Sequence, residues 1–313
     1  MQKKIALLLV TLTAIFWGTN FIVSKSILEH LSPIIAAALR FSLAAVLLLP
    51  IILYSESLNK IKEAIKQNLS VYLFLGIVGV AGFNGLFFLG IKYTTPINGA
   101  LIMGTNPLVT LLLSVIFLKE PIYKNQRIGV LFSLMGVLVV ITNGTLQQLL
   151  HLHIAFGDWI IMGSNLCWAV YGVVGKRYLK SSKPLVTTTV TMIIGALTLI
   201  LLALPELNMA QLWDQSKQIC GGLMYVVIFG TVLAYLFWNY GLTHLGASNT
   251  AVFFNLVPLV TVSHALILGQ SISSVQIWGG LAVIFGVLVS TNIIKVPYLK
   301  ENGRSNEPLE VAG

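Results

Sequence analysis

The sequence predicts an all-α polytopic membrane protein, with ten transmembrane helices arranged as two inverted five-helix repeats. Three observations predict this fold class. The chain is 57% apolar and only 9% charged, its apolar residues fall in long runs, and its second half repeats a pattern of the first. A soluble domain carries about 25% charged residues, so this chain lacks the charge to cover a water-facing surface. The mean hydropathy of +0.90 agrees.

The expected spans are runs of about 20 mostly apolar residues, the length that a helix needs to cross a bilayer. The runs are continuous, whereas strands of a membrane barrel would alternate apolar and polar residues. Most connections are short, and the longest internal polar stretch, SESLNKIKEAIKQN, predicts an amphipathic surface helix over 55–68. The ten expected spans cover 5–23, 34–54, 72–91, 98–118, 126–143, 157–175, 185–204, 219–240, 248–268 and 276–294.

The first span also resembles a signal peptide, because two lysines precede its apolar run. No small-x-small cleavage site is evident, and Trp17, Asn20 and Phe21 follow the apolar run directly. We therefore expect an uncleaved first helix.

The placement of Lys and Arg orients the chain, because cytoplasmic loops of membrane proteins are enriched in both. With the N-terminus inside and ten crossings, fifteen of the nineteen fall on the cytoplasmic side, three on the outer side, and Arg40 within a span. The net charge of +9 is thus loop charge, and a nucleic-acid partner is not expected. Both termini are expected in the cytoplasm.

An internal duplication appears when the chain is shifted by 151 residues against itself. Trp17 then meets Trp168, and Pro107 meets Pro258, each proline beginning the tetrapeptide Pro-Leu-Val-Thr. This is one five-helix unit present twice. Further equivalent pairs are Lys25 and Lys176, Pro33 and Pro184, Gly79 and Gly230 and, at a shift of 150, Gly129 and Gly279, and Gly136 and Gly286.

An odd number of helices per unit makes the second copy enter the membrane from the opposite side. Loop charges agree, since 175–183 holds four basic residues where the equivalent loop of the first copy holds one. We divide the chain into a first repeat over 1–145, a second, inverted repeat over 146–295, and a disordered cytoplasmic tail over 296–313. Inverted repeats are typical of secondary transporters that bind substrate between the repeats near mid-membrane.

Pro107 and Pro258 fall near the centres of their spans. Each removes one helical hydrogen bond and leaves a carbonyl, of Met103 or Phe254, without its usual partner. Such polarity is tolerated in a bilayer where it faces protein or a water-filled cavity. We expect both prolines to act as hinges that line or gate a path, with packing kinks as the alternative.

The residues that carry a family resemblance are FWGTNFIVSK at 16–25, Arg40 in the second span, NPLVTLLLSVIFLKEP at 106–121 and the duplicated unit. Over 5–294 the chain resembles the drug/metabolite transporter superfamily, EamA-type branch. The resemblance implies a ten-helix carrier of the bacterial inner (plasma) membrane that exports amino acids or other small metabolites. It also implies a central cavity lined by helices 1, 3, 4, 6, 8 and 9.

Arg40 is an intramembrane charge, which is expensive and needs a partner. We expect it to anchor the fold, with contact to a substrate carboxylate as the alternative. The second repeat departs from the family pattern, because Thr191 stands where the first has Arg40 and Gln270 where it has Glu120. Neither charge therefore has a symmetric role.

No Asp or Glu is expected near mid-membrane, so the usual carboxylate for proton coupling or for capture of a cationic drug is missing. Neutral amides between aromatic walls suit a small zwitterion or an amphipathic metabolite. For any single Asn, a hydrogen bond between helices is the alternative. The expected lining comprises Trp17, Asn20, Asn84, Asn106, Asn165, Trp168, Tyr171, Tyr235, Trp238 and Asn255, with Phe83, Phe87 and Asn239 beside them.

The sequence thus predicts a secondary transporter that exports amino acids or related small metabolites by alternating access. A lipid or lipid-linked metabolite flippase of the same fold and a drug-efflux carrier are the alternatives. No HExxH, paired carboxylates or nucleophile elbow occurs, so an enzyme is not expected. Cys167 and Cys220 show no metal spacing, and we expect no metal or cofactor. The expected partners are the lipid bilayer and a small-molecule substrate, with the protein a monomer or weak dimer.

Overall fold

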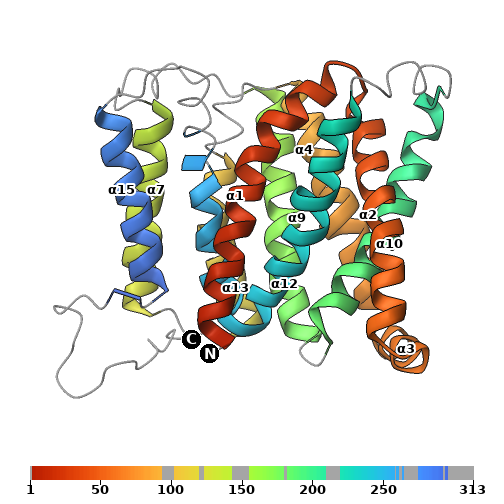
Figure 1. Cartoon of the computed structure of the whole chain (residues 1–313). Helices are drawn as coiled ribbons and strands as arrows, with labels where there is room; N and C mark the ends of the chain where they lie inside the picture. The colour runs from red at the N-terminus through yellow and green to blue at the C-terminus, as the bar shows by residue number, and fades with distance from the viewer. Residues whose placement is uncertain are drawn as a thin grey trace.

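The structure is a computed structural model, and its described part is helical, without a strand. Most of the helices run roughly along one direction (Figure 1), as in a polytopic membrane protein. Pro258 and the tail 296–313 lie outside the described residues. The structure describes residues 2–93, 102–119, 123–142, 155–179, 182–208, 219–257, 259–260, 263, 274–291 and 293–294.

Four of the described helices are long and apolar enough to cross a membrane: Pro33–Ser55, Leu58–Gly90, Pro184–Glu206 and Ile219–Leu245. Large apolar side chains on the flank of the bundle are exposed, among them Val46 at 62%, Leu201 at 67% and Trp278 at 71%. Exposure of this kind is unfavourable in water and is satisfied by lipid.

The first two helices are α1 (Gln2–Leu28) and α2 (Pro33–Ser55). α2 begins with a proline, whose missing N–H is harmless in the first turn, and the Ser32 hydroxyl accepts a hydrogen bond from the Ile35 N–H at 3.4 Å. α1 continues to Leu28, past the expected end of its span at residue 23. Hydropathy marks where apolar sequence stops, whereas a helix continues until its backbone pattern is broken.

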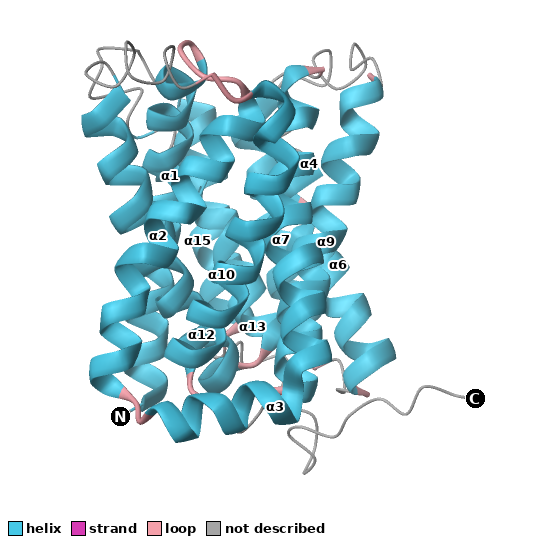
Figure 2. Cartoon of the chain, turned by 90° about the vertical axis from the view of Figure 1, so that its right-hand side faces the viewer, coloured by secondary structure: helices cyan, strands magenta, loops and turns pink. Residues whose placement is uncertain are grey.

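The polar stretch after α2 forms the start of α3 (Leu58–Phe74), as the sequence predicts. Asn68 has non-helical φ and ψ of −130° and 24°, which kinks this helix. Figure 2 shows the first part of α3 lying across the lower end of the bundle, at a steep angle to the other helices. The kink therefore separates a surface segment from an apolar segment that enters the bundle.

Two π-helical segments interrupt the long apolar helices. η1 (Leu75–Gly82) joins α3 to α4 (Phe83–Lys92), and η4 (Ile228–Leu233) leads into α12 (Ala234–Leu245). A π segment disturbs the regular hydrogen-bond ladder and is frequent at functional sites. The last residues of η1 and η4, Gly82 and Leu233, lie 151 residues apart in the chain, which is the shift of the sequence repeat.

The other elements continue the same helical pattern. α10 begins with Pro184, the repeat equivalent of the proline that begins α2. These elements are α6 (Asn106–Leu113), η2 (Ser114–Leu118), α7 (Lys124–Thr142), α9 (Phe156–Tyr178), α10 (Pro184–Ala203), η3 (Leu204–Glu206), α13 (Ala247–Ala251), η5 (Val252–Asn255) and α15 (Ser274–Ser290).

α7 and α15 pack against each other backbone to backbone, at one side of the bundle in Figure 1. A Cβ atom added at Gly129 would lie 2.5 Å from the carbonyl oxygen of Gly286, and one added at Gly286 would lie 2.5 Å from that of Gly129. A Cβ atom at Gly136 would lie 2.6 Å from the carbonyl oxygen of Gly279. The early part of each helix thus faces the late part of the other, so the pair is antiparallel.

Candidate functional site

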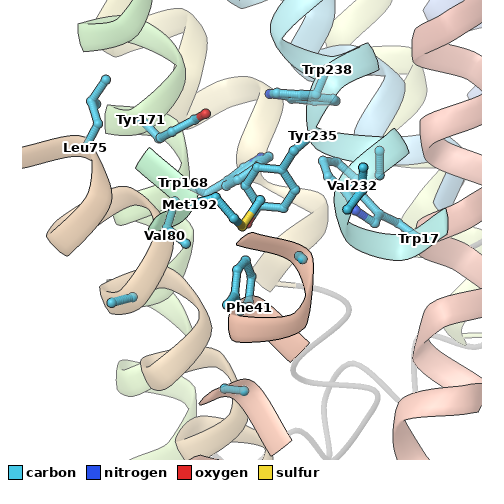
Figure 3. Packing of buried hydrophobic residues seen from close by; sticks show 14 of the residues in the cluster. Trp17, Phe41, Leu75, Val80, Trp168, Tyr171, Met192, Val232, Tyr235 and Trp238 are labelled. Carbon is cyan, nitrogen blue, oxygen red and sulfur yellow. The ribbon is translucent and has the colours of Figure 1, made fainter. Parts of the chain in front are cut away.

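The candidate site is an aromatic cluster where α1, α9 and α12 meet (Figure 3). The rings of Trp17 and Trp168 meet edge to face, with centroids 5.3 Å apart. Trp168 stacks on Tyr171 at 5.4 Å, and Trp238 lies 5.0 Å from Trp17. Edge-to-face and offset contacts are the favoured geometries of aromatic pairs. We define the aromatic cluster as Trp17, Phe83, Trp168, Tyr171, Tyr235, Trp238 and Phe254.

The structure therefore brings together five of the predicted site residues from three helices. Trp17 and Trp168 are repeat equivalents, so the cluster joins the same position of both halves of the chain. Phe83 packs on Trp168 at 4.8 Å, and Phe87 extends this wall at 6.0 Å from Phe83. Phe254 of η5, which the sequence did not single out as a wall, contacts Trp17 at 5.4 Å.

Buried amides border the aromatic cluster and bind its two tyrosines. The Asn84 Nδ2 donates to the Val80 carbonyl at 2.8 Å and to the Tyr235 hydroxyl at 3.2 Å. The Asn239 Nδ2 donates to the Tyr171 hydroxyl and to Thr188 Oγ1, each at 2.8 Å. These amides are already hydrogen-bonded between elements, so they position the tyrosines in this closed arrangement.

Asn106 and Asn165 form a separate pair between α6 and α9. The Asn106 Nδ2 donates to the Asn165 Oδ1 at 2.6 Å, and the Asn165 Nδ2 donates to the Ile102 carbonyl at 2.8 Å. The hydroxyl of Thr105 donates to the same Ile102 carbonyl at 2.6 Å. Pro107 stands in the first turn of α6, directly after this break. Pro107 thus lies at the start of a helix, and the Ile102 carbonyl before it accepts hydrogen bonds from side chains.

Three buried polar atoms have no hydrogen-bond partner among the described residues of this region: the Asn20 Oδ1, the Trp168 Nε1 and the Asn255 Oδ1. The other end of the Asn255 amide, its Nδ2, donates to the Ser133 hydroxyl at 2.8 Å. A buried polar atom without a partner costs about 1–3 kcal/mol. Two of these atoms, on Asn20 and Trp168, flank Trp17 and Gly230 and are suited to accept or donate a hydrogen bond to a bound molecule.

Arg40 is buried, with 6% of its surface exposed, and it contacts the π segment η4. Its Nε donates to Thr231 Oγ1 at 2.6 Å, and its Nη2 donates to the Gly230 carbonyl at 2.9 Å. The guanidinium also lies over the Phe41 ring, 5.2 Å from its centroid. Within the described chain no carboxylate pairs with it. The arginine is therefore held by neutral acceptors, as structural anchoring requires.

The sequence missed these acceptors. The sequence repeat pairs Gly230 with Gly79. Nothing in the residue pattern, however, identified a π segment at Gly230 or a backbone carbonyl that would accept a hydrogen bond from an arginine. In the part of the chain that the structure describes, no group of three metal-ligating side chains occurs.

A cavity of about 330 Å³ lies between the end of α9, the start of α10 and the end of α12. These parts lie at the lower end of the bundle in Figure 1. Asn239, which binds Tyr171, is one of its lining residues, so the cavity adjoins the aromatic cluster. The lining comprises Gly175, Lys176, Leu179, Ser182, Pro184, Thr187, Asn239, Leu242 and Thr243.

Comparison with known proteins gives consistent results. Residues 4–142 and 155–292 each match the EamA-like transporter family. An uncharacterized transporter of Bacillus subtilis, YyaM, is 43% identical over 91% of this chain and 92% of its own length. A probable amino-acid metabolite efflux pump of Salmonella typhimurium is 25% identical over 90% of this chain and 93% of its own length.

A solved crystal structure superposes with a TM-score of 0.77 over 92% of this chain and 96% of that chain. At 18% identity, this likeness concerns the fold alone. The relatives are named as transporters, and the apolar helices make this chain an integral membrane protein.

Proposed function

The chain belongs to the EamA-like transporter family, and we propose that it is a secondary transporter exporting amino acids or related small metabolites across the bacterial inner (plasma) membrane. The observation that carries this proposal is the contact between Trp17 and Trp168. These repeat-equivalent residues meet at the buried aromatic cluster, which is where a carrier built from two repeats would hold its substrate.

We propose two inverted five-helix repeats over 1–145 and 146–295, with both termini cytoplasmic. Three observations support this arrangement. The family matches the chain twice, the π segments η1 and η4 lie at equivalent positions, and α7 and α15 meet as an antiparallel pair at equivalent glycines. A two-fold axis in the membrane plane would relate the members of each pair.

The aromatic cluster favours a substrate without net charge. In the described chain, acidic side chains lie outside the cluster: Asp158 caps the start of α9, and Glu56 pairs with Lys183 at the end of α2. Large aromatic faces with a few polar atoms, such as those of Asn20 and Trp168, suit an amphipathic zwitterion. The name of the Salmonella relative, an amino-acid metabolite efflux pump, supports the same class.

Transport would proceed by alternating access, with the closed cluster opening toward one face at a time. Pro107 starts α6 at a break held by side chains, and we propose that this break, and its equivalent at Pro258, absorbs the movement. The substrate would contact Trp17, Asn20, Asn84, Asn106, Asn165, Trp168, Tyr171, Tyr235, Trp238 and Asn255.

The test is efflux from proteoliposomes loaded with single members of a panel of amino acids, at equal pH on both sides. We expect efflux of at least one neutral amino acid, and a loss of about tenfold or more in Trp168→Ala, because this residue contacts most of the aromatic cluster. The matched control is Trp278→Ala, since Trp278 is 71% exposed on the flank.

The same proteoliposomes also test the two alternative functions, a lipid flippase and a drug-efflux carrier. Translocation of a fluorescent lipid analogue, without amino-acid efflux, would identify a flippase. Efflux of lipophilic cations alone would identify a drug carrier. Either result would contradict the proposed substrate class.

A further inference from the structure

The first part of α3, residues 58–67, lies across the lower end of the bundle (Figure 2); we call it the surface segment. We propose that the surface segment binds anionic phospholipid headgroups through Lys62 and Lys66, with Leu58 inserted among the lipids beside them. This inference goes beyond the transported substrate, because it concerns the lipid that surrounds the protein.

The surface segment has two different faces. Ile61 is buried and Ile65 packs against the hydrophobic core, so one face rests on the bundle. Leu58, Lys62 and Lys66 are exposed, and their spacing of four residues places them in one row along the helix. Exposed leucine beside lysine is typical of a helix that lies in the membrane interface, where the long lysine side chain reaches the headgroups.

The surface segment lies at the level of the headgroups. α2 is long and apolar enough to cross a membrane, and it ends at Ser55, shortly before the surface segment begins. The end of α2 is exposed, with Leu53 at 52% and Tyr54 at 96%. Tyrosine is enriched where the hydrocarbon core meets the headgroups. The exposed apolar flank of the bundle therefore continues from α2 to Leu58, which is 55% exposed.

The charge of the exposed row favours an anionic partner. The two described acids nearest to it along the chain have other partners. The Glu56 carboxylate lies 2.6 Å from the Lys183 Nζ, and the Glu63 Oε1 accepts a hydrogen bond from the Gln67 Nε2 at 3.3 Å. Two like charges four residues apart weaken a helix. A phosphate group between the two lysines would relieve their repulsion, and an anionic membrane surface attracts lysines close to it.

The kink at Asn68 gives the two parts of α3 different surroundings. Beyond the kink, Tyr72 is buried and its hydroxyl donates to the Ser182 Oγ at 3.0 Å, so the bundle holds the apolar part. At the kink, the Asn68 Nδ2 donates to the Ala64 carbonyl at 3.2 Å, which is a bond within α3 itself. Because the surface segment rests on the bundle by one face only, its exposed row is available to lipid.

The test uses the full chain with Cys167 and Cys220 replaced by serine and with Leu58→Cys labelled with bimane. The protein is reconstituted in phosphatidylcholine vesicles that contain either dibrominated phosphatidylglycerol or dibrominated phosphatidylcholine, equally in both leaflets. Bromine quenches a nearby fluorophore, so the ratio of the two quenching efficiencies measures the enrichment of anionic lipid at the surface segment. Equal leaflets make this ratio independent of the orientation of the protein.

We expect the ratio at Leu58→Cys to exceed by about fivefold the ratio at a reference position, Val46→Cys. Val46 is 62% exposed on the flank of α2. Lys62→Gln combined with Lys66→Gln should lower the ratio to that of the reference, whereas both changes to arginine should preserve it.

The matched control also removes two exposed lysines at the lower end of the bundle, Lys3→Gln combined with Lys4→Gln on α1. It should leave the enrichment at Leu58→Cys nearly unchanged. An equal loss in both double variants would show attraction by overall charge, and a ratio equal to that at Val46→Cys in the unsubstituted chain would show no lipid preference. Either result would overturn the assignment.

The competing occupant of the exposed row is the tail, because 300–313 holds Glu301, Glu307 and Glu310. Deletion of 300–313 should leave the enrichment of phosphatidylglycerol unchanged. An enrichment that appears only after this deletion would assign the two lysines to the tail and overturn the lipid site.

Discussion

Trp17 and Arg40 donate hydrogen bonds to the same acceptor, the carbonyl oxygen of Gly230. The indole Nε1 of Trp17 lies 3.0 Å from this oxygen, and the Nη2 of Arg40 lies 2.9 Å from it. The acceptor belongs to the π segment η4, so α1 and α2 are both fastened to one distorted turn. The only basic side chain expected within a span is thus tied to the edge of the aromatic cluster.

Arg40→Ala should lower the stability of the protein in detergent by about 2 kcal/mol, because it removes charge-assisted hydrogen bonds to Gly230 and Thr231. The measurement is thermal unfolding followed by loss of monodisperse protein. Lys66→Ala, on the exposed face of α3, is the control and should change little. If amino-acid binding were abolished in folded Arg40→Ala while stability was unaltered, the arginine would be a substrate ligand instead.

Gly129→Leu should disrupt the contact between α7 and α15. Its Cβ atom would lie 2.5 Å from the Gly286 carbonyl oxygen, and a backbone atom cannot move aside as a flexible side chain can. We expect aggregation or a large fall in the melting temperature. Gly85→Leu is the control, since nothing lies within 4 Å of a Cβ atom there. A well-folded Gly129→Leu protein would contradict the packing described for this pair.

Asn106 and Asn165 should show strong energetic coupling. Either single change to alanine leaves a buried amide without its partner, so the double change should cost clearly less than the sum of the two single changes. A double-mutant cycle on thermal stability measures this difference, which we expect to be about 1 kcal/mol. Additive costs would show that the two amides act independently.

Cysteines at Glu29 and Ser182 test the inverted repeat. Glu29 precedes α2 and Ser182 precedes α10, and these two helices begin with equivalent prolines. In a background without native cysteines, impermeant reagents should label Glu29→Cys from the outer side and Ser182→Cys from the cytoplasmic side. Labelling from one common side would rule out the inversion.

Pro107→Ala should slow transport while leaving substrate affinity close to normal. The proline starts α6 after the break at Ile102 and Thr105, and alanine would favour a continuous helix through it. Initial efflux rates and equilibrium binding, measured on the same preparation, separate the two effects. Unchanged rates would reduce Pro107 to a packing feature.

Hydropathy and repeated residues were sufficient to predict the helical membrane fold, because burying apolar runs in lipid depends on composition and length alone. The surface helix at the start of α3 could also be predicted, because the polar residues of 55–68 are evident from composition alone. The sequence repeat pointed to Trp17 and Trp168 as a pair, and the structure brings their rings into contact.

The hydrogen-bond partners could not be predicted. The amides expected to line a cavity are largely bonded between helices, Asn106 to Asn165 and Asn84 to Tyr235, because partner choice depends on helix rotation, which hydropathy does not fix. The π segment that receives Arg40, Ile228–Leu233, has the sequence IFGTVL, in which no residue pattern marks a π-helix. Only the three-dimensional backbone reveals its available carbonyl.

The glycine contact between α7 and α15 also has a consequence for biosynthesis. α7 is complete at Thr142, whereas the helix that covers its glycine face begins at Ser274. During translation, that groove remains in contact with lipid or with the insertion machinery while more than a hundred further residues are made. The contact between α7 and α15 therefore forms late, and a chain truncated before α15 would leave the glycine face of α7 without the helix that covers it.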